Sequence, residues 1–148
     1  MRKIKTWIYI LAFSVLNAHE LDAMSQHEWR LLLVLRDLPP DLAQSLFVTL
    51  HVPLVAMILW LTFNRSSAVT SWSRRTVCAF GIIHIGLHWH LQDHPNYTFH
   101  SWLSETLIVG YGVAGLLYLL IDGGGRLRRR HVKQNAQDGA HGSGGSAG

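Results

Sequence analysis

The feature that most constrains this chain is an ionisable residue in each of its four hydrophobic segments. A charged side chain at the centre of a bilayer costs about 2.5–3.5 kcal/mol on insertion scales, so such residues usually face the protein interior and mark a functional site. They are His19, Glu20 and Asp22 at the end of the first segment, His51 in the second, His84 and His88 in the third, and Glu105 in the fourth. A fold that accommodates them must bring their helices together.

Four stretches of the chain are long enough to cross a bilayer, which takes about 20 mostly apolar residues. Apolar residues make up 49% of the 148 residues and charged residues only 15%, a balance typical of a small membrane protein. We predict an all-α fold, a bundle of four transmembrane helices in one domain of residues 1–122. The predicted spans are about 6–24, 41–63, 73–92 and 101–121.

Two segments outside these spans have their own patterns. The Leu31–Leu35 run is too short to cross the membrane and is flanked by arginines. We therefore predict a short interfacial helix over His27–Leu38, between the first two spans. Residues 123–148 are basic at first and then rich in glycine and serine. This composition predicts a disordered tail.

Basic residues gather on one side of the predicted bundle. The positive-inside rule assigns that side to the cytoplasm, so we predict cytoplasmic N- and C-termini. Alternatively, the first segment is a signal peptide cleaved after Ala18, which would leave three spans. Eleven of the 13 Lys and Arg residues share the basic side: Arg2, Lys3, Lys5, Arg65, Arg74, Arg75, Arg126, Arg128, Arg129, Arg130 and Lys133.

Helical periodicity and depth predict that the ionisable residues share one site. His84 and His88 are four residues apart and lie on one helix face, and His19 and Asp22 are three apart. At a rise of about 1.5 Å per residue, the histidines lie deep in the membrane and the carboxylates lie near its outer rim. We therefore predict a polar site in the outer half of the bundle.

Metal or haem binding is the first hypothesis for this site. Histidine pairs at i, i+4, completed by carboxylates, are a common ligand set for transition metals. His51 and His84, both near the predicted midplane on different helices, could instead be axial ligands of haem. The candidate metal ligands are His19, Asp22, His51, His84, His88 and Glu105.

Two other functions are compatible with the same residues. Chains of His, Asp and Glu relay protons in membranes, so proton-coupled transport, or small-ligand binding without metal, is the alternative. The third is a structural or accessory subunit, in which buried histidines bond neighbouring helices. Glu20, His27 and Glu28 are further polar candidates at the rim. Whether a reaction is catalysed stays open. We expect the lipid bilayer, and a second copy or another membrane subunit, as partners, and no nucleic acid.

Several short motifs resemble a family of small, uncharacterised, mostly bacterial four-helix membrane proteins. The resemblance covers about residues 5–120 and implies a multi-pass protein of the bacterial inner membrane with an intramembrane cluster of histidines and acids. It implies no activity. The shared motifs are His19-Glu20-Leu21-Asp22-Ala23, Glu28-Trp29-Arg30, His51-Val52-Pro53-Leu54, His84 with His88, and His94-Pro95-Asn96 followed by Phe99 and Ser101-Trp102.

Overall fold

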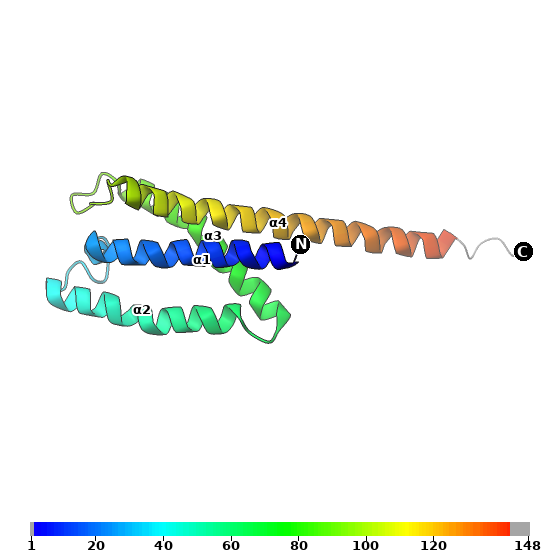
Figure 1. The fold of residues 1–148 in the computed structure, drawn as a ribbon, viewed down its shortest axis with the longest axis horizontal. Helices are drawn as coiled ribbons and strands as arrows, with labels where there is room; N and C mark the ends of the chain where they lie inside the picture. Colours follow the sequence, from blue (N-terminus) through cyan, green and yellow to red (C-terminus); the bar gives the residue numbers. More distant parts are fainter. Residues whose placement is uncertain (1, 143–148) are drawn as a thin grey trace, which may run out of the picture.

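The computed structural model describes the backbone of residues 2–142 and the side chains of residues 3–125 and Gln134. Within these residues the fold is all-α, with no strand. The elements, in chain order, are α1 (Arg2–Ser25), the 3₁₀ turn η1 (Glu28–Arg30), α2 (Pro40–Thr62), α3 (Ser67–Leu91) and α4 (Trp102–Gly142) (Figure 1).

Helix α4 is the central element of the bundle. It packs most extensively against α3 and α1, whereas α2 makes fewer contacts and lies at the side of α1 (Figure 1). Only three residues of α2 are buried: Ala43, Phe47 and Thr62. Most of the apolar surface of α2 therefore faces outward.

Helices α3 and α4 approach closely where α4 has glycines. A methyl group added at Gly115 would overlap the backbone carbonyl of Cys78, and one added at Gly112 would overlap the Ile85 side chain. At Gly110 the nearest atom would be 3.7 Å away, an ordinary contact. The close approach of these two helices thus depends on Gly112 and Gly115.

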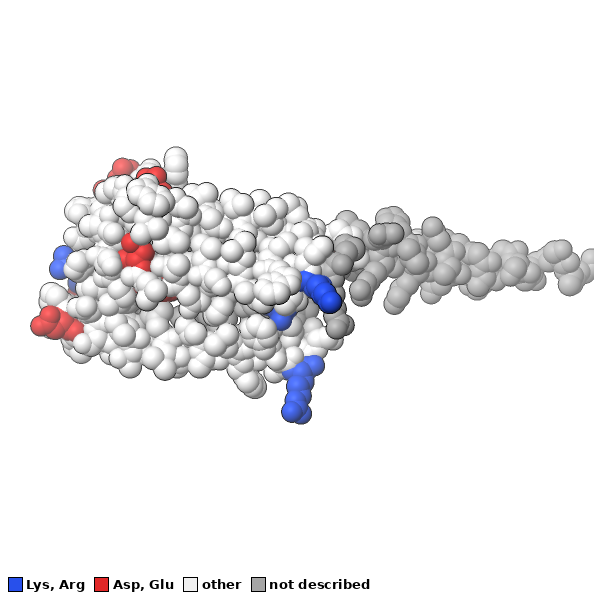
Figure 2. Space-filling view, viewed as in Figure 1, with Lys and Arg blue, Asp and Glu red and all other residues white. Residues whose placement is uncertain are grey.

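The two ends of the bundle carry opposite charge (Figure 2). We call the end where α1 and α3 finish the acidic end, and the end where they begin the basic end. The acidic end has seven carboxylates, Glu20, Asp22, Glu28, Asp37, Asp41, Asp93 and Glu105, and two cations, Arg30 and Arg36. Among the described side chains the basic end has five cations, Lys3, Lys5, Arg65, Arg74 and Arg75, and one carboxylate, Asp122.

Among the residues that the structure describes, two helices are long and apolar enough to cross a membrane: Pro40–Thr62 and the Trp102–Gly125 part of α4. The sequence predicted four such spans. Helices α1 and α3 have the required length, but polar and charged residues interrupt their apolar stretches. The structure thus supports an all-α fold with two candidate membrane helices among the described residues.

The segment between α1 and α2 differs from the predicted interfacial helix. Only Glu28–Arg30 is helical, and residues 31–38 form successive turns. Leu31 and Leu35 are buried in the bundle while Leu33 and Val34 are exposed. These leucines therefore attach the segment to the core. At the other end of the chain, α4 continues to Gly142, past Gly123, where the tail was expected to begin; residues 143–148 lie outside the described residues.

Candidate metal centre

Three buried histidines meet between α1 and α3. Each of His19, His84 and His88 offers a ring nitrogen, and these nitrogens lie within 4.8 Å of one another. The Nε2 atoms of His19 and His84 are 2.8 Å apart, so one of these rings donates a hydrogen bond to the other. The side chains of all three residues are almost completely buried.

The positions of the three histidines follow from helix geometry. His84 and His88 are one turn apart on α3, so both rings point to the same side. His19 lies in the last two turns of α1, which runs beside α3 and α4. Phe99 covers the cluster, with ring centroids 5.7 Å from His19 and 4.7 Å from His88. This arrangement excludes bulk water from the rings.

Glu28 comes to the cluster from η1. Its Oε2 lies 3.7 Å from Nε2 of His19, and its side chain is 15% exposed. The preceding residue, His27, has a left-handed backbone with φ of 56°, which reverses the chain after α1. Burial raises the pKa of Glu28 to about 7, and the nearby Glu20 carboxylate adds to this effect. Glu28 is therefore a carboxyl group that can exist with or without its proton at neutral pH.

Four buried polar atoms near this cluster have no hydrogen-bond partner among the described residues. They are His19 Nδ1, Asp22 Oδ2, Glu28 Oε2 and Trp29 Nε1. Buried polar groups are nearly always satisfied in native proteins, and each exception calls for an explanation such as an ion or a water. These four atoms are therefore groups that an ion or a water at this place could satisfy.

The second nitrogen of His88 has its own partner. Nδ1 of His88 and the hydroxyl of Tyr97 are 3.2 Å apart. Metal-bound histidines usually use their other ring nitrogen in this way, which fixes the orientation of the ring. Nε2 of His88 is then the atom available to the centre.

His51 lies in a neighbouring pair instead of the histidine cluster. Its Nε2 is 2.8 Å from Oε2 of Glu20, and its Nδ1 is 2.6 Å from the carbonyl oxygen of Phe47. Both nitrogens of His51 are thus engaged, while His84 faces His19. The structure does not form the His51–His84 pair on which the haem hypothesis depends.

The remaining candidates are not part of the cluster. Glu105 is exposed in the first turn of α4. Asp22 is half-buried one turn beyond His19, and the ring of His27 packs against that of Trp29 with centroids 5.0 Å apart. Of the six proposed metal ligands, the structure brings together His19, His84 and His88.

Sequence reasoning missed the contributions of Tyr97 and Phe99 to this site. Both follow the His94-Pro95-Asn96 turn, and both rings lie against His88. It also missed Asp122 of α4, which is buried at the basic end of the bundle. The available signal for Asp122 was its place as a lone acid beside a concentration of basic residues.

Fold and site together define a class: a small all-α protein with two candidate membrane helices and a buried three-histidine cluster that could bind a metal ion. Residues 5–123 match the family of unknown function DUF6713, and the chain belongs to this family. The match confirms the resemblance to an uncharacterised family. No curated protein and no solved structure matches the chain.

Proposed function

We propose that this protein spans the membrane four times and binds one transition-metal ion at His19, His84 and His88, with Glu28 beside the open coordination position. The observation that carries the proposal is the convergence of three buried histidine nitrogens within 4.8 Å. Imidazole ligands suit zinc, copper, iron and nickel. A site with three histidines and one open position is typical of catalytic zinc centres.

The spacing of the nitrogens is compatible with such an ion. Tetrahedral coordination at about 2.0–2.1 Å puts ligand nitrogens about 3.3 Å apart. This value lies between the 2.8 Å His19–His84 separation and the 4.8 Å limit of the cluster. Small ring rotations therefore suffice to admit the ion, which would replace the hydrogen bond between the two rings.

Unpartnered atoms around the cluster support a metal over a purely structural role. With Nε2 of His19 bound to a metal, its Nδ1 carries a proton and needs an acceptor. Oδ2 of Asp22, one turn along α1, is a buried acceptor without a described partner. The unpartnered Oε2 of Glu28 is placed to bind the ion or a water on it.

Charge at the acidic end also favours a cation. This end has seven carboxylates and two arginines among the described residues. Such an excess raises the local concentration of cations and speeds their arrival. We therefore place the entry route of the metal at the acidic end.

Metal analysis of purified variants tests the proposal. Protein in detergent is stripped with a chelator, loaded with Zn²⁺ or Co²⁺, desalted and analysed for metal. We expect one ion per chain in the native protein. In His84→Ala the loss of affinity should exceed about 10–100-fold, which is the cost of losing a residue that only hydrogen-bonds a metal ligand. Bound Co²⁺ provides a visible spectrum that reports the geometry of the site.

His90→Ala is the matched control, because His90 is exposed on the same helix, six residues after His84. It should keep full metal content. His84→Asn, a polar variant, guards against a folding defect in the alanine variant. Absence of a stoichiometric metal in the native protein, or an equal loss in the His90 variant, would overturn the proposal.

A second candidate function rests on the Glu20–His51 pair. The pair joins α1 to α2 at 2.8 Å, and each side chain is about a quarter exposed. Such a pair suits proton-coupled transport or binding of a small polar ligand without metal. This alternative requires a proton flux in liposomes that His51→Ala removes while the metal content stays unchanged.

A further inference from the structure

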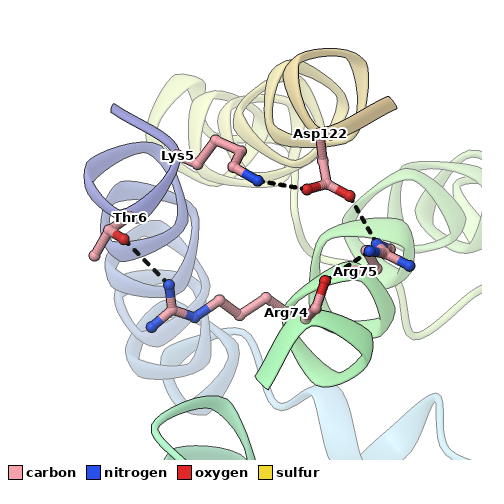
Figure 3. Close-up of polar contacts among 6 residues, drawn as sticks. Lys5, Thr6, Arg74, Arg75 and Asp122 are labelled. Carbon is pink, nitrogen blue, oxygen red and sulfur yellow. Dashed lines mark hydrogen bonds and ion pairs between the residues drawn. The ribbon is translucent and has the colours of Figure 1, made fainter. Parts of the chain in front are cut away.

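The basic end contains a charge network in which one carboxylate is shared by two cations (Figure 3). Asp122 accepts from Lys5 Nζ at 2.7 Å and from Arg75 Nε at 2.8 Å. Arg75 also donates to the hydroxyl of Ser71 at 2.6 Å. These contacts tie α1, α3 and α4 together, and they engage both oxygens of the single described carboxylate of this end.

Arg74 is held by neutral groups and not by a carboxylate. It donates to the carbonyl oxygen of Thr62 at 3.0 Å. It also donates to the hydroxyl of Thr6 at 3.3 Å (Figure 3). Its guanidinium lies over the rings of Tyr9 and Phe63, at 5.0 and 5.2 Å from their centroids. Among the described side chains no carboxylate forms an ion pair with Arg74, so its positive charge is not cancelled locally.

A pocket opens beside this uncompensated charge, at the turn between α2 and α3. Its volume is about 370 Å³, and it is lined by Leu59, Trp60, Phe63, Asn64 and Arg65. Arg65 is exposed, and no described carboxylate forms an ion pair with it. The Phe63 ring forms one wall of the pocket and is also the ring on which Arg74 stacks. The pocket therefore combines an apolar wall with two nearby cations.

The apolar wall continues into the outward surface of α2. Trp60 is 69% exposed and Phe63 is 55% exposed, at the end of a helix that buries little of its length. A mostly apolar pocket that is lined by one arginine and opens onto an apolar helix face matches a molecule with an anionic head and a hydrocarbon tail. The turn also precedes α3, whose N-terminus is the positive end of the helix dipole.

We propose that this pocket binds the headgroup of an anionic phospholipid, with Arg65 on the phosphate and an acyl chain along Leu59 and Trp60. Basic pockets between helices at the cytoplasmic side of membrane proteins bind such headgroups. The inference rests on the membrane placement in the proposed function, but it does not depend on the metal.

Lipid binding to the whole purified protein tests the inference that the pocket holds an anionic headgroup. Delipidated protein in detergent is titrated with phosphatidylglycerol or with phosphatidylcholine of the same acyl chains, and bound lipid is counted by native mass spectrometry. The native protein should prefer phosphatidylglycerol. Arg65→Gln should lower that preference about fivefold, the effect of one basic residue near an anionic surface. Arg36→Gln removes an exposed arginine of the acidic end and should leave the preference unchanged.

Three results would overturn the inference: equal binding of the two lipids by the native protein, equal losses in both variants, or displacement of phosphatidylglycerol by millimolar inorganic phosphate. The last result would identify a site for free phosphate. The metal content of Arg65→Gln is measured in parallel. If the protein keeps its metal and sediments with membranes but binds both lipids equally, only the lipid inference is overturned. If the protein does not partition into membranes, the membrane placement in the proposed function is overturned as well.

Discussion

Glu28 has a carboxyl group whose surroundings favour the protonated form. Burial raises its pKa to about 7 from an ordinary value of 4.5, and the charge of Glu20 adds to the shift. Below about pH 4.5 the group is neutral in both the folded and the unfolded chain. Between about pH 4.5 and 7 the unfolded chain loses this proton first, so the free energy of unfolding falls as pH rises, and above pH 7 the loss is constant.

We predict that Glu28→Gln removes this pH dependence in the metal-free protein. The variant should match the native protein near pH 4.5 and exceed its free energy of unfolding at pH 8 by on the order of 2 kcal/mol. The measurement is denaturant unfolding in detergent across this pH range, with chelator present. Parallel pH profiles for the two proteins would contradict the prediction. With metal added the ranking should reverse, because the ion favours an ionised carboxylate.

Residue patterns predicted part of this site and could not predict the rest. The i, i+4 spacing of His84 and His88 fixes their shared face, and this pair is in the observed cluster. Depth put His51 and His84 at the same level of the bundle, but depth does not give the direction in which a helix face points. His51 is one turn beyond the buried Phe47 and so faces α1, where Glu20 meets it.

At the scale of elements, the contact between α3 and α4 depends on Gly115. An added methyl group would overlap the carbonyl of Cys78, and backbone atoms cannot move aside as a flexible side chain can. We predict that Gly115→Ala lowers the free energy of unfolding by about 2–3 kcal/mol, the upper range for an overpacked core. Thermal or denaturant unfolding of the purified protein measures this.

Gly110→Ala is the control for this prediction. It lies on the same helix, and its added methyl group would have its nearest neighbour, Val15, at 3.7 Å. Its stability should stay within about 1 kcal/mol of the native value, since alanine also favours the helix. Equal effects of the two substitutions would show that the close approach at Gly115 carries no special cost.

Helices were easier to predict from the sequence than the connection between them. The long apolar runs gave α2 and α4 to within a few residues of their starts. The Leu31–Leu35 run suggested an interfacial helix, but Leu31 and Leu35 pack into the core against residues such as Phe47 and Phe99. Because these partners are distant in the sequence, no local pattern could reveal that the segment folds inward.

For the whole molecule, the separation of charge between the two ends sets the expected orientation. The sequence predicted a basic side, and the described basic residues other than Arg30 and Arg36 do lie at one end (Figure 2). If all four helices cross the membrane, the turn before α3 is cytoplasmic and the turn after α3 is on the outer side. These two turns therefore report whether α3 crosses, which its composition leaves open.

We predict opposite labelling of single cysteines placed in these two turns. Cys78 is the only cysteine and is fully buried, so a Cys78→Ala background removes it from the experiment. Asn96→Cys, after α3, should react with a membrane-impermeant maleimide in cells with an intact inner membrane. Ser67→Cys, at the first residue of α3, should react only after the membrane is opened. Both sites are exposed in the structure, so burial cannot account for a lack of reaction.

The possible outcomes separate the arrangements of the helices. Labelling of both sites, or of neither, before disruption would place the two turns on the same side, and α3 would then not cross the membrane. The reverse pattern would put the basic end outside, against the charge distribution. Only the predicted pattern places the acidic end, with His19, His84 and His88 near it, on the outer side, so that a metal ion would reach the cluster without first entering the cytoplasm.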